Sequence, residues 1–240
     1  MNKRLLRYSR LLHKWAGLIL AIQILFWILG GVIMSAIPLE KVHGKHLANK
    51  QLENTFARAD YVYSLDGLIR EHSRPIKQIL FTQVLNRPFY LLHIDAPHGE
   101  NMIAIDAFTG DKLQNLTRQQ VNQIAQMHYL GDGNIRSTQL LENAPQEASR
   151  NQGAVWQVVY DDLWDTTLYV SPQSGQLTTV RSDIWRIFDF FWMLHIMDYD
   201  EREDFNNPLL IAFATAALVF TLSGFVLLFS SFRSWKRAFR

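Results

Sequence analysis

Histidine is the residue type that could carry metal or cofactor chemistry in this chain. The sequence has eight histidines and no cysteine, so no thiolate can hold an iron–sulfur cluster or attach a c-type haem covalently. Two of the histidines, His13 and His195, stand beside long apolar or aromatic segments. Their imidazole nitrogens are the best candidates for ligands to a haem iron.

His13 is followed one helical turn later by Gly17. Positions four residues apart lie on the same face of a helix, and a porphyrin can lie flat against a helix only if the neighbour of its axial histidine is small. The pair therefore predicts a haem site at this end of the helix. The alternative is that His13, next to Lys14 and Trp15, is an interfacial residue at the depth of the lipid headgroups.

His195 ends an aromatic stretch over residues 184–197. Phe188, Phe191, Trp192 and His195 follow the spacing i, i+3, i+4, i+7 and form one stripe on a helix. Since the stretch is short and carries two charged residues, we expect it to rest at the outer membrane surface. As a haem ligand, His195 would have an apolar wall that includes Trp192 and limits access of water to the iron. The alternative is an aromatic belt with a hydrogen-bonded histidine.

His43 is a third candidate for cofactor binding. It lies just after the first apolar span and is three residues from His46, with Gly44 between them. The two histidines could chelate a metal, or His43 could supply the opposite axial bond to a haem held by His195. The alternative is a solvated loop next to the membrane, which Gly44 favours because it makes a regular helix doubtful.

Two apolar segments are long enough to cross a membrane. From Trp15 to Ile37 there are 23 residues without an ionisable side chain. At about 1.5 Å per residue that is roughly 35 Å of helix, against a hydrocarbon layer about 30 Å thick. A second uncharged segment runs from Pro208 to Phe232. The first could also be a cleaved signal peptide, but its apolar core is longer than such peptides have.

Basic residues cluster at the two ends of the chain. Residues 1–14 contain five Lys or Arg, residues 233–240 contain four, and neither end has an acid. The positive-inside rule then places both termini in the cytoplasm and residues 38–206 outside, in the periplasm of a Gram-negative cell. A nucleic-acid-binding protein would not carry its positive charge only at its tips, so we expect a bacterial inner-membrane protein with no nucleic-acid partner.

The outer segment is predicted to be an α+β domain made of two similar units. In each unit a helix precedes three strand-like runs, and the steps Thr109-Gly110 and Ser174-Gly175 close the units 65 residues apart. The helices are expected over 63–71 and 117–128, the latter ending at His128, where a positive charge would suit the helix terminus. The strands are expected over 76–85, 89–95, 101–105, 134–141, 154–161 and 166–170.

These patterns divide the chain into eight parts. They are a basic N-terminus (1–14), transmembrane helix 1 (15–37), a juxtamembrane segment (38–61), unit 1 (62–115), unit 2 (116–182), an interfacial aromatic helix with an acidic segment (183–206), transmembrane helix 2 (207–232) and a basic tail (233–240).

The repeated helix, three strands and closing turn, Asp106-x-x-Thr109-Gly110 and Ser171-x-x-Ser174-Gly175, resemble PepSY domains. The sequence Leu12 to Leu18 (LHKWAGL) and the stretch Phe191 to His195 (FWMLH) resemble the histidine-bearing helices of PepSY-associated transmembrane proteins. The resemblance implies a PepSY fold and either an inhibitory or binding module, as in protease pro-regions, or a haem b ferric-siderophore reductase. This chain has two spans where such reductases have four or more.

One chain lacks the ligands for a complete haem site in the membrane. The second span and the tail after it contain no histidine, so a second axial ligand for His13 must come from a homodimer or another subunit. We find no dinucleotide fingerprint, phosphate loop or nucleophile with a base, so the electron donor would be a separate protein. We expect an electron-transfer component that assists periplasmic metal reduction; the alternatives are a non-enzymatic binding or protease-inhibitory module and an accessory subunit of a larger complex.

Overall fold

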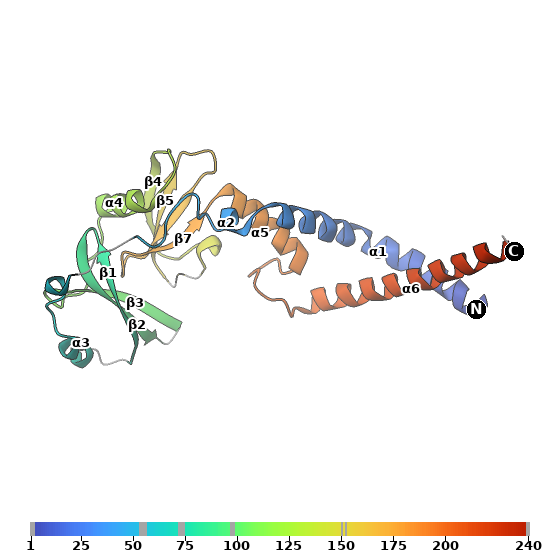
Figure 1. Ribbon diagram of the computed structural model, residues 1–240, viewed down its shortest axis with the longest axis horizontal. Helices are drawn as coiled ribbons and strands as arrows, with labels where there is room; N and C mark the ends of the chain where they lie inside the picture. The colour runs from blue at the N-terminus through green and yellow to red at the C-terminus, as the bar shows by residue number, and fades with distance from the viewer. Residues whose placement is uncertain are drawn as a thin grey trace. The chain divides into compact units, whose positions relative to one another are not determined.

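The computed structural model describes residues 3–52, 57–71, 75–96, 99–149, 151 and 153–238 (Figure 1). The chain forms two compact units. The globular unit spans Leu39–Arg186, and the helical unit combines Met1–Pro38 with Ile187–Arg240. The fold is therefore α+β, with two small sheets between long apolar terminal helices.

The first half of the globular unit is a three-stranded antiparallel sheet. Its strands β1 (Ile76–Val84), β2 (Arg87–Ala96) and β3 (Gly99–Asp106) pair in chain order. Leu85 and Asn86 join β1 to β2 with positive φ angles of 52° and 61°, as a two-residue hairpin turn of type I′ requires. Helix α3 (Leu65–Glu71) packs on this sheet through Leu68, which is 1% exposed.

The second half repeats this order and adds a strand. Strands β4 (Ile135–Leu141), β5 (Val155–Tyr160), β6 (Thr167–Val170) and β7 (Leu177–Arg181) form an antiparallel sheet in chain order. Helix α4 (Arg118–His128) begins at a capping box, in which the Thr117 hydroxyl accepts from the Gln120 backbone N–H and the Gln120 side chain accepts from the Thr117 N–H.

The prediction of three strands in each unit is wrong for the second unit, because β7 was not predicted. The extra strand β7 nevertheless has a counterpart in the first half. In the second half Val170 pairs with Leu177, and in the first half Ile105 pairs with Lys112 as an isolated bridge. These pairs stand at the 65-residue offset of the repeat, so β7 extends a contact that the first half also makes. Gly110 and Gly175 have φ angles of +82° and +65°, which confirms that the closing turns need glycine.

The two halves share one hydrophobic core. Val84, Phe89 and Ala104 of the first sheet belong to the same buried cluster as Val158 and Leu168 of the second sheet. The apolar face of α4 covers this cluster. A backbone hydrogen bond of 3.2 Å from Ala104 N–H to Gln173 O also joins the halves. The minor helices of the unit are α2 (Leu39–Val42), η1 (Arg58–Asp60) and η2 (Gln146–Ala148).

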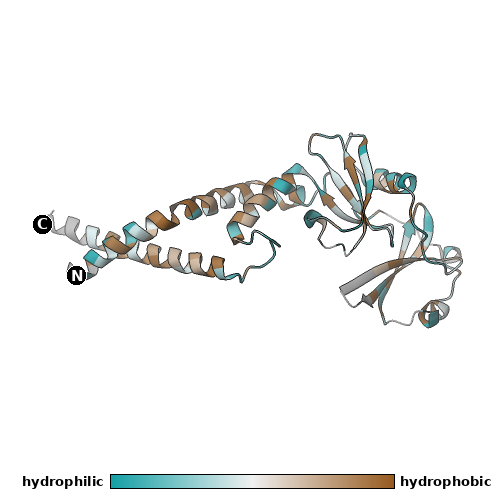
Figure 2. Ribbon diagram, turned by 180° about the vertical axis from the view of Figure 1, so that it is seen from behind, coloured by the Kyte–Doolittle hydropathy of each residue, from teal (hydrophilic) through white to brown (hydrophobic). Residues whose placement is uncertain are grey.

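The helical unit contains α1 (Lys3–Ala36), most of α5 (Asp183–Ile196) and α6 (Pro208–Ala238). The segments Leu6–Ala36 and Pro208–Phe232 are long and apolar enough to cross a membrane. Figure 2 shows the hydrophobic colouring continuing along both helices. Large apolar side chains stay exposed on them, for example Ile19 at 71% and Leu222 at 55%, as lipid-facing residues would. Both helices are therefore candidate transmembrane helices.

Helices α1 and α6 are antiparallel. Contacts join Gly17 to Phe220 near one end, and Trp27 and Leu210 line the same pocket near the other. Helix α6 begins at Pro208, and its first turn lies beside Trp27 of α1. It therefore packs along α1 only from that residue toward the N-terminus. Beyond that point the partner of α1 is α5, since Phe191 O lies 3.5 Å from the position that a Cβ on Gly30 would occupy. The predicted first span therefore includes residues that pack on α5 rather than on α6.

Candidate functional site

The His13 imidazole lies between α1 and α6. Its Nδ1 is 3.0 Å from Ser223 Oγ and 3.2 Å from the Phe220 carbonyl oxygen, and its ring stacks on the Phe220 ring with a centroid distance of 4.2 Å. Ser223 Oγ itself donates to the Phe220 carbonyl at 2.7 Å. Since that hydroxyl hydrogen is already used, Nδ1 must carry the proton and donate to the two oxygens. The lone pair of Nε2 is then available as an acceptor or a ligand.

Two glycines let α1 and α6 approach at this point. A Cβ on Gly224 would lie 3.0 Å from His13 Cε1, and a Cβ on Gly17 would lie 2.9 Å from Phe220 Cε2. The space beside Gly17 is thus filled by a ring of α6. Gly17 contributes here to helix packing, and a porphyrin against this face would require the Phe220 side chain to move.

His195 lies in the last turn of α5, where side chains bind three consecutive backbone carbonyls. Gln23 Nε2 donates to Leu194 O at 3.1 Å and Trp27 Nε1 donates to His195 O at 2.9 Å. Asn207 Nδ2 donates to Ile196 O at 2.9 Å. The final carbonyls of a helix have no partner within the helix, so these bonds fix the end of α5 against α1 and the start of α6.

The His195 side chain lines an apolar pocket of about 390 Å³, together with Trp27, Trp192, Ile196, Phe205 and Leu210. Its Nδ1 is buried and has no hydrogen-bond partner among the residues that the structure describes. A buried polar atom without a partner is costly, so such an atom in an aromatic pocket marks a candidate ligand site. Trp192 is held in place, since its Nε1 donates to Arg202 O at 3.1 Å.

His43 belongs to the globular unit and not to the helical unit of His13 and His195. Its side chain is exposed, and its backbone N–H donates to Leu39 O at 2.9 Å. Gly44 has a φ angle of +70°, so no regular helix continues from His43 to His46. Of the alternatives given for His43, the structure thus shows an exposed loop. A role for His43 in haem binding stays a prediction.

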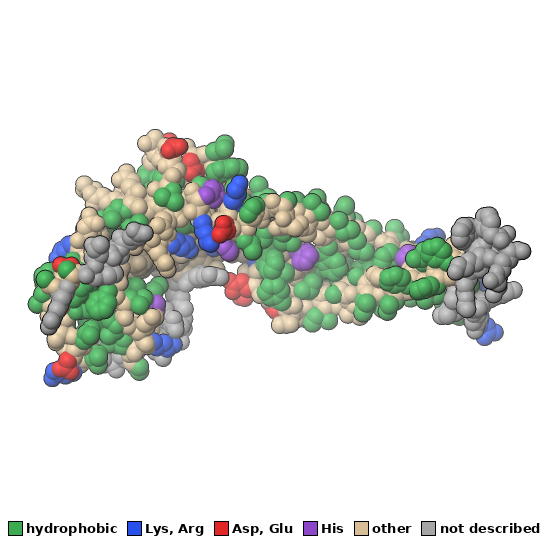
Figure 3. All heavy atoms as spheres, in the orientation of Figure 1, with side chains coloured by type: hydrophobic (Ala, Val, Ile, Leu, Met, Phe, Trp, Pro, Cys, Tyr) green, Lys and Arg blue, Asp and Glu red, His purple; other side chains and the backbone are tan. Residues whose placement is uncertain are grey.

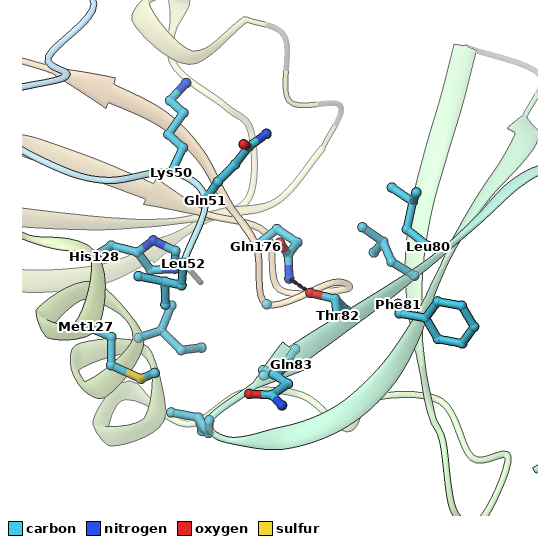
Figure 4. A pocket seen from close by; sticks show the side chains of 15 residues that line it. Lys50, Gln51, Leu52, Leu80, Phe81, Thr82, Gln83, Met127, His128 and Gln176 are labelled. Carbon is cyan, nitrogen blue, oxygen red and sulfur yellow. Dashed lines mark hydrogen bonds between the residues drawn. The ribbon is translucent and has the colours of Figure 1, made fainter. Parts of the chain in front are cut away.

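A second cavity, of about 340 Å³, lies between β1 and α4 of the globular unit (Figure 4). His128 lines it, and its Nδ1 lies 2.6 Å from Asn49 O, which makes Nδ1 the donor. Burial lowers the pKa of His128 below its usual 6.5, while the bond to Asn49 opposes this shift. Burial of His128 thus favours the neutral form and opposes the positive charge that the end of α4 would favour. Across the cavity, Gln176 Nε2 donates to Thr82 Oγ1 at 3.3 Å.

No local pattern in the sequence indicates this cavity, because its walls come from segments far apart in the chain. The only available signal was the stripe Val121, Ile124, Ala125 and His128, which indicates a buried helix face without showing what faces it.

No protein-family model, curated protein or solved structure matches this chain.

Proposed function

We propose that this protein is a haem b carrier of the bacterial inner membrane, with a PepSY-like periplasmic domain, that assists the reduction of periplasmic metal such as ferric-siderophore iron. The observation that carries the proposal is the buried Nδ1 of His195, which has no hydrogen-bond partner among the described residues and belongs to an imidazole that lines an apolar aromatic pocket. Imidazole is a common axial ligand of haem iron, and an apolar pocket favours a macrocycle.

The environment of His13 supports a second ligand site. Its Nδ1–H donates to Ser223 Oγ and the Phe220 carbonyl, as the non-ligating nitrogen of a metal-bound histidine commonly does. His13 and His195 are too far apart to share one iron, since His195 contacts α1 at Trp27, fourteen residues beyond His13, or about 21 Å along a helix. Each would therefore hold its own haem.

The partner ligand for each haem would come from a second copy of the chain or from another subunit. A two-fold axis would bring two His13 side chains together and make a four-helix bundle from two copies of α1 and α6. The haem would supply one-electron transfer, and this chain's residues would hold it, exclude water and fix its orientation.

The test is the absorption spectrum of the full chain extracted from membranes. We expect a Soret band that shifts when dithionite is added. His195→Ala should remove at least half of the absorbance, and His13→Ala should remove the remainder. His46→Ala is the matched control, because His46 is an exposed histidine of the globular unit and its loss should leave the spectrum unchanged.

A colourless protein, or a Soret band that survives the double substitution of His13 and His195, would contradict the proposal.

The cavity beside His128 favours a second candidate, a non-enzymatic module that binds a periplasmic partner and is anchored by the two helices. That candidate predicts a colourless chain whose partner is retained by the wild type and lost when Gln176→Ala or Met127→Ala alters the wall of the cavity.

A further inference from the structure

A basic groove of about 520 Å³ lies at the N-terminal end of α1, within the helical unit. The described residues that line it are Leu6, Arg7, Arg10, Leu11 and Lys14. Positions i, i+3 and i+7 of a helix lie on one face, so the three cations form a single stripe two turns long. Three permanent cations on one concave surface favour an anionic ligand.

The carboxylates of the helical unit lie away from this stripe. Residues 1–39 and 205–240 contain no Asp or Glu, so all the acids of the unit fall within residues 189–204. That segment contacts α1 at Gln23, Trp27 and Gly30, at least nine residues beyond Lys14, or about 14 Å along a helix. The Asp and Glu side chains of its own unit therefore do not neutralise the stripe.

An exposed apolar stripe continues the same face of α1 beyond the cations. Leu18 is four residues after Lys14, and Leu25 is seven residues after Leu18; they are 67% and 60% exposed. Trp15 stands at the junction, 53% exposed, with Lys14 Nζ 5.9 Å from the centre of its ring. Figure 3 shows hydrophobic side chains along the long helices, with Lys or Arg side chains toward the end where Figure 1 marks the termini.

This sequence of cations, tryptophan and apolar surface along one helix face matches the parts of a phospholipid. A free phosphate ion would use the cations alone. A phospholipid would use them for its headgroup and the apolar stripe for its acyl chains, with tryptophan at the boundary between the two. We propose that this face of α1 binds an anionic phospholipid, with Arg7, Arg10 and Lys14 around the phosphate and Leu11 and Leu18 along the acyl chains. The site requires the membrane location of the proposed function but not haem.

The test is native mass spectrometry of the full chain extracted from membranes in detergent, with phosphatidylglycerol or phosphatidylcholine added at equal concentration. We expect the wild type to retain phosphatidylglycerol preferentially, and Arg7→Gln/Arg10→Gln to lower its affinity about tenfold. Arg7→Lys/Arg10→Lys keeps the charge and should keep the preference. The matched control is Lys112→Gln/Arg118→Gln, which removes the same charge from exposed positions of the globular unit and should change the affinity less than about twofold.

Two further arms separate the lipid from a free phosphate ion. Inorganic phosphate should displace phosphatidylglycerol only at far higher concentrations. Leu18→Asn should weaken lipid retention and leave any binding of inorganic phosphate unchanged. Displacement by inorganic phosphate at equal concentration would overturn the lipid assignment, and equal lipid retention by Arg7→Gln/Arg10→Gln and its control would overturn the site itself.

The same preparation distinguishes this site from the haem proposal. A chain that is extracted from membranes and retains phosphatidylglycerol but has no Soret band would support the lipid site and contradict only the haem proposal. A wild-type chain recovered in the soluble fraction without detergent would contradict the membrane location, and the lipid site with it.

Discussion

The histidines of this protein differ in what their Nδ1 atoms contact. Those of His13 and His128 donate to oxygen atoms, which fixes the tautomer and leaves Nε2 as an acceptor. The Nδ1 of His195 is buried without such a partner in the part of the chain that the structure describes. Hydrogen bonds thus hold His13 and His128 in one orientation, whereas His195 has an unsatisfied nitrogen and a pocket beside it.

The first prediction concerns the pH dependence of the globular unit. Burial lowers the pKa of His128, so the unfolded chain binds a proton more readily than the folded one. The stability that neutral His128 provides is present above its unfolded pKa of 6.5 and is lost as the pH falls below that value. Hydrogen exchange of α4 and β5 in the full chain should therefore show weaker protection at about pH 5.5 than at about pH 7.5.

His128→Gln, which has no titratable group, should reduce this pH dependence, whereas His43→Gln at an exposed position should keep it. If both variants retain the wild-type dependence, His128 is not the group that titrates.

At the scale of elements, glycines determine how the apolar helices pack. Gly17 and Gly224 accept a ring from the opposite helix, Phe220 in one case and His13 in the other. Small residues at helix crossings allow the close approach that drives association in lipid, where burial of apolar surface contributes little. In the contact between α1 and α6, each helix thus places an aromatic ring against a glycine of the other helix.

The second prediction tests that contact. In Gly224→Leu the new side chain would meet His13 and push α6 from α1, which should cost about 1–3 kcal/mol and lower the Tm of the detergent-extracted chain. Gly31→Leu is the control on α1, because a Cβ there has no described atom within 4 Å. Equal Tm values for the two variants would show that His13 does not lie against Gly224.

At the scale of the whole molecule, two units of different composition share one chain. The globular unit contains both sheets with their common core, and the helical unit combines the two ends of the chain. Its two long apolar helices and the basic residues at both termini are the basis for proposing that the termini are cytoplasmic and the globular unit periplasmic.

The third prediction checks this topology with single cysteines, for which the chain offers a clean background. A membrane-impermeant maleimide should label Asn143→Cys, an exposed position of the globular unit, in intact spheroplasts. Tyr8→Cys, also exposed but at the basic end of α1, should be labelled only after permeabilisation. The reverse pattern would place the globular unit in the cytoplasm and remove the proposed role in periplasmic metal reduction.

Local patterns in the sequence determined the elements of this protein. Uncharged length predicts the two apolar helices, and short strand-like runs predict six of the seven strands. Glycine after a polar residue predicts the positive φ angles at Gly110 and Gly175. Each of these signals lies within a few residues, because backbone preference and amphipathic periodicity are local properties.

Only the tertiary structure decided which side chains meet. The bond from His13 to Ser223 joins residues 210 positions apart, and that from Trp27 to His195 joins residues 168 apart. Strand β7 depends on pairing with β6, and the lowered pKa of His128 depends on burial by distant segments. Such contacts result from packing between elements, so the burial and hydrogen bonding of each candidate ligand follow from the fold and not from its neighbours in the sequence.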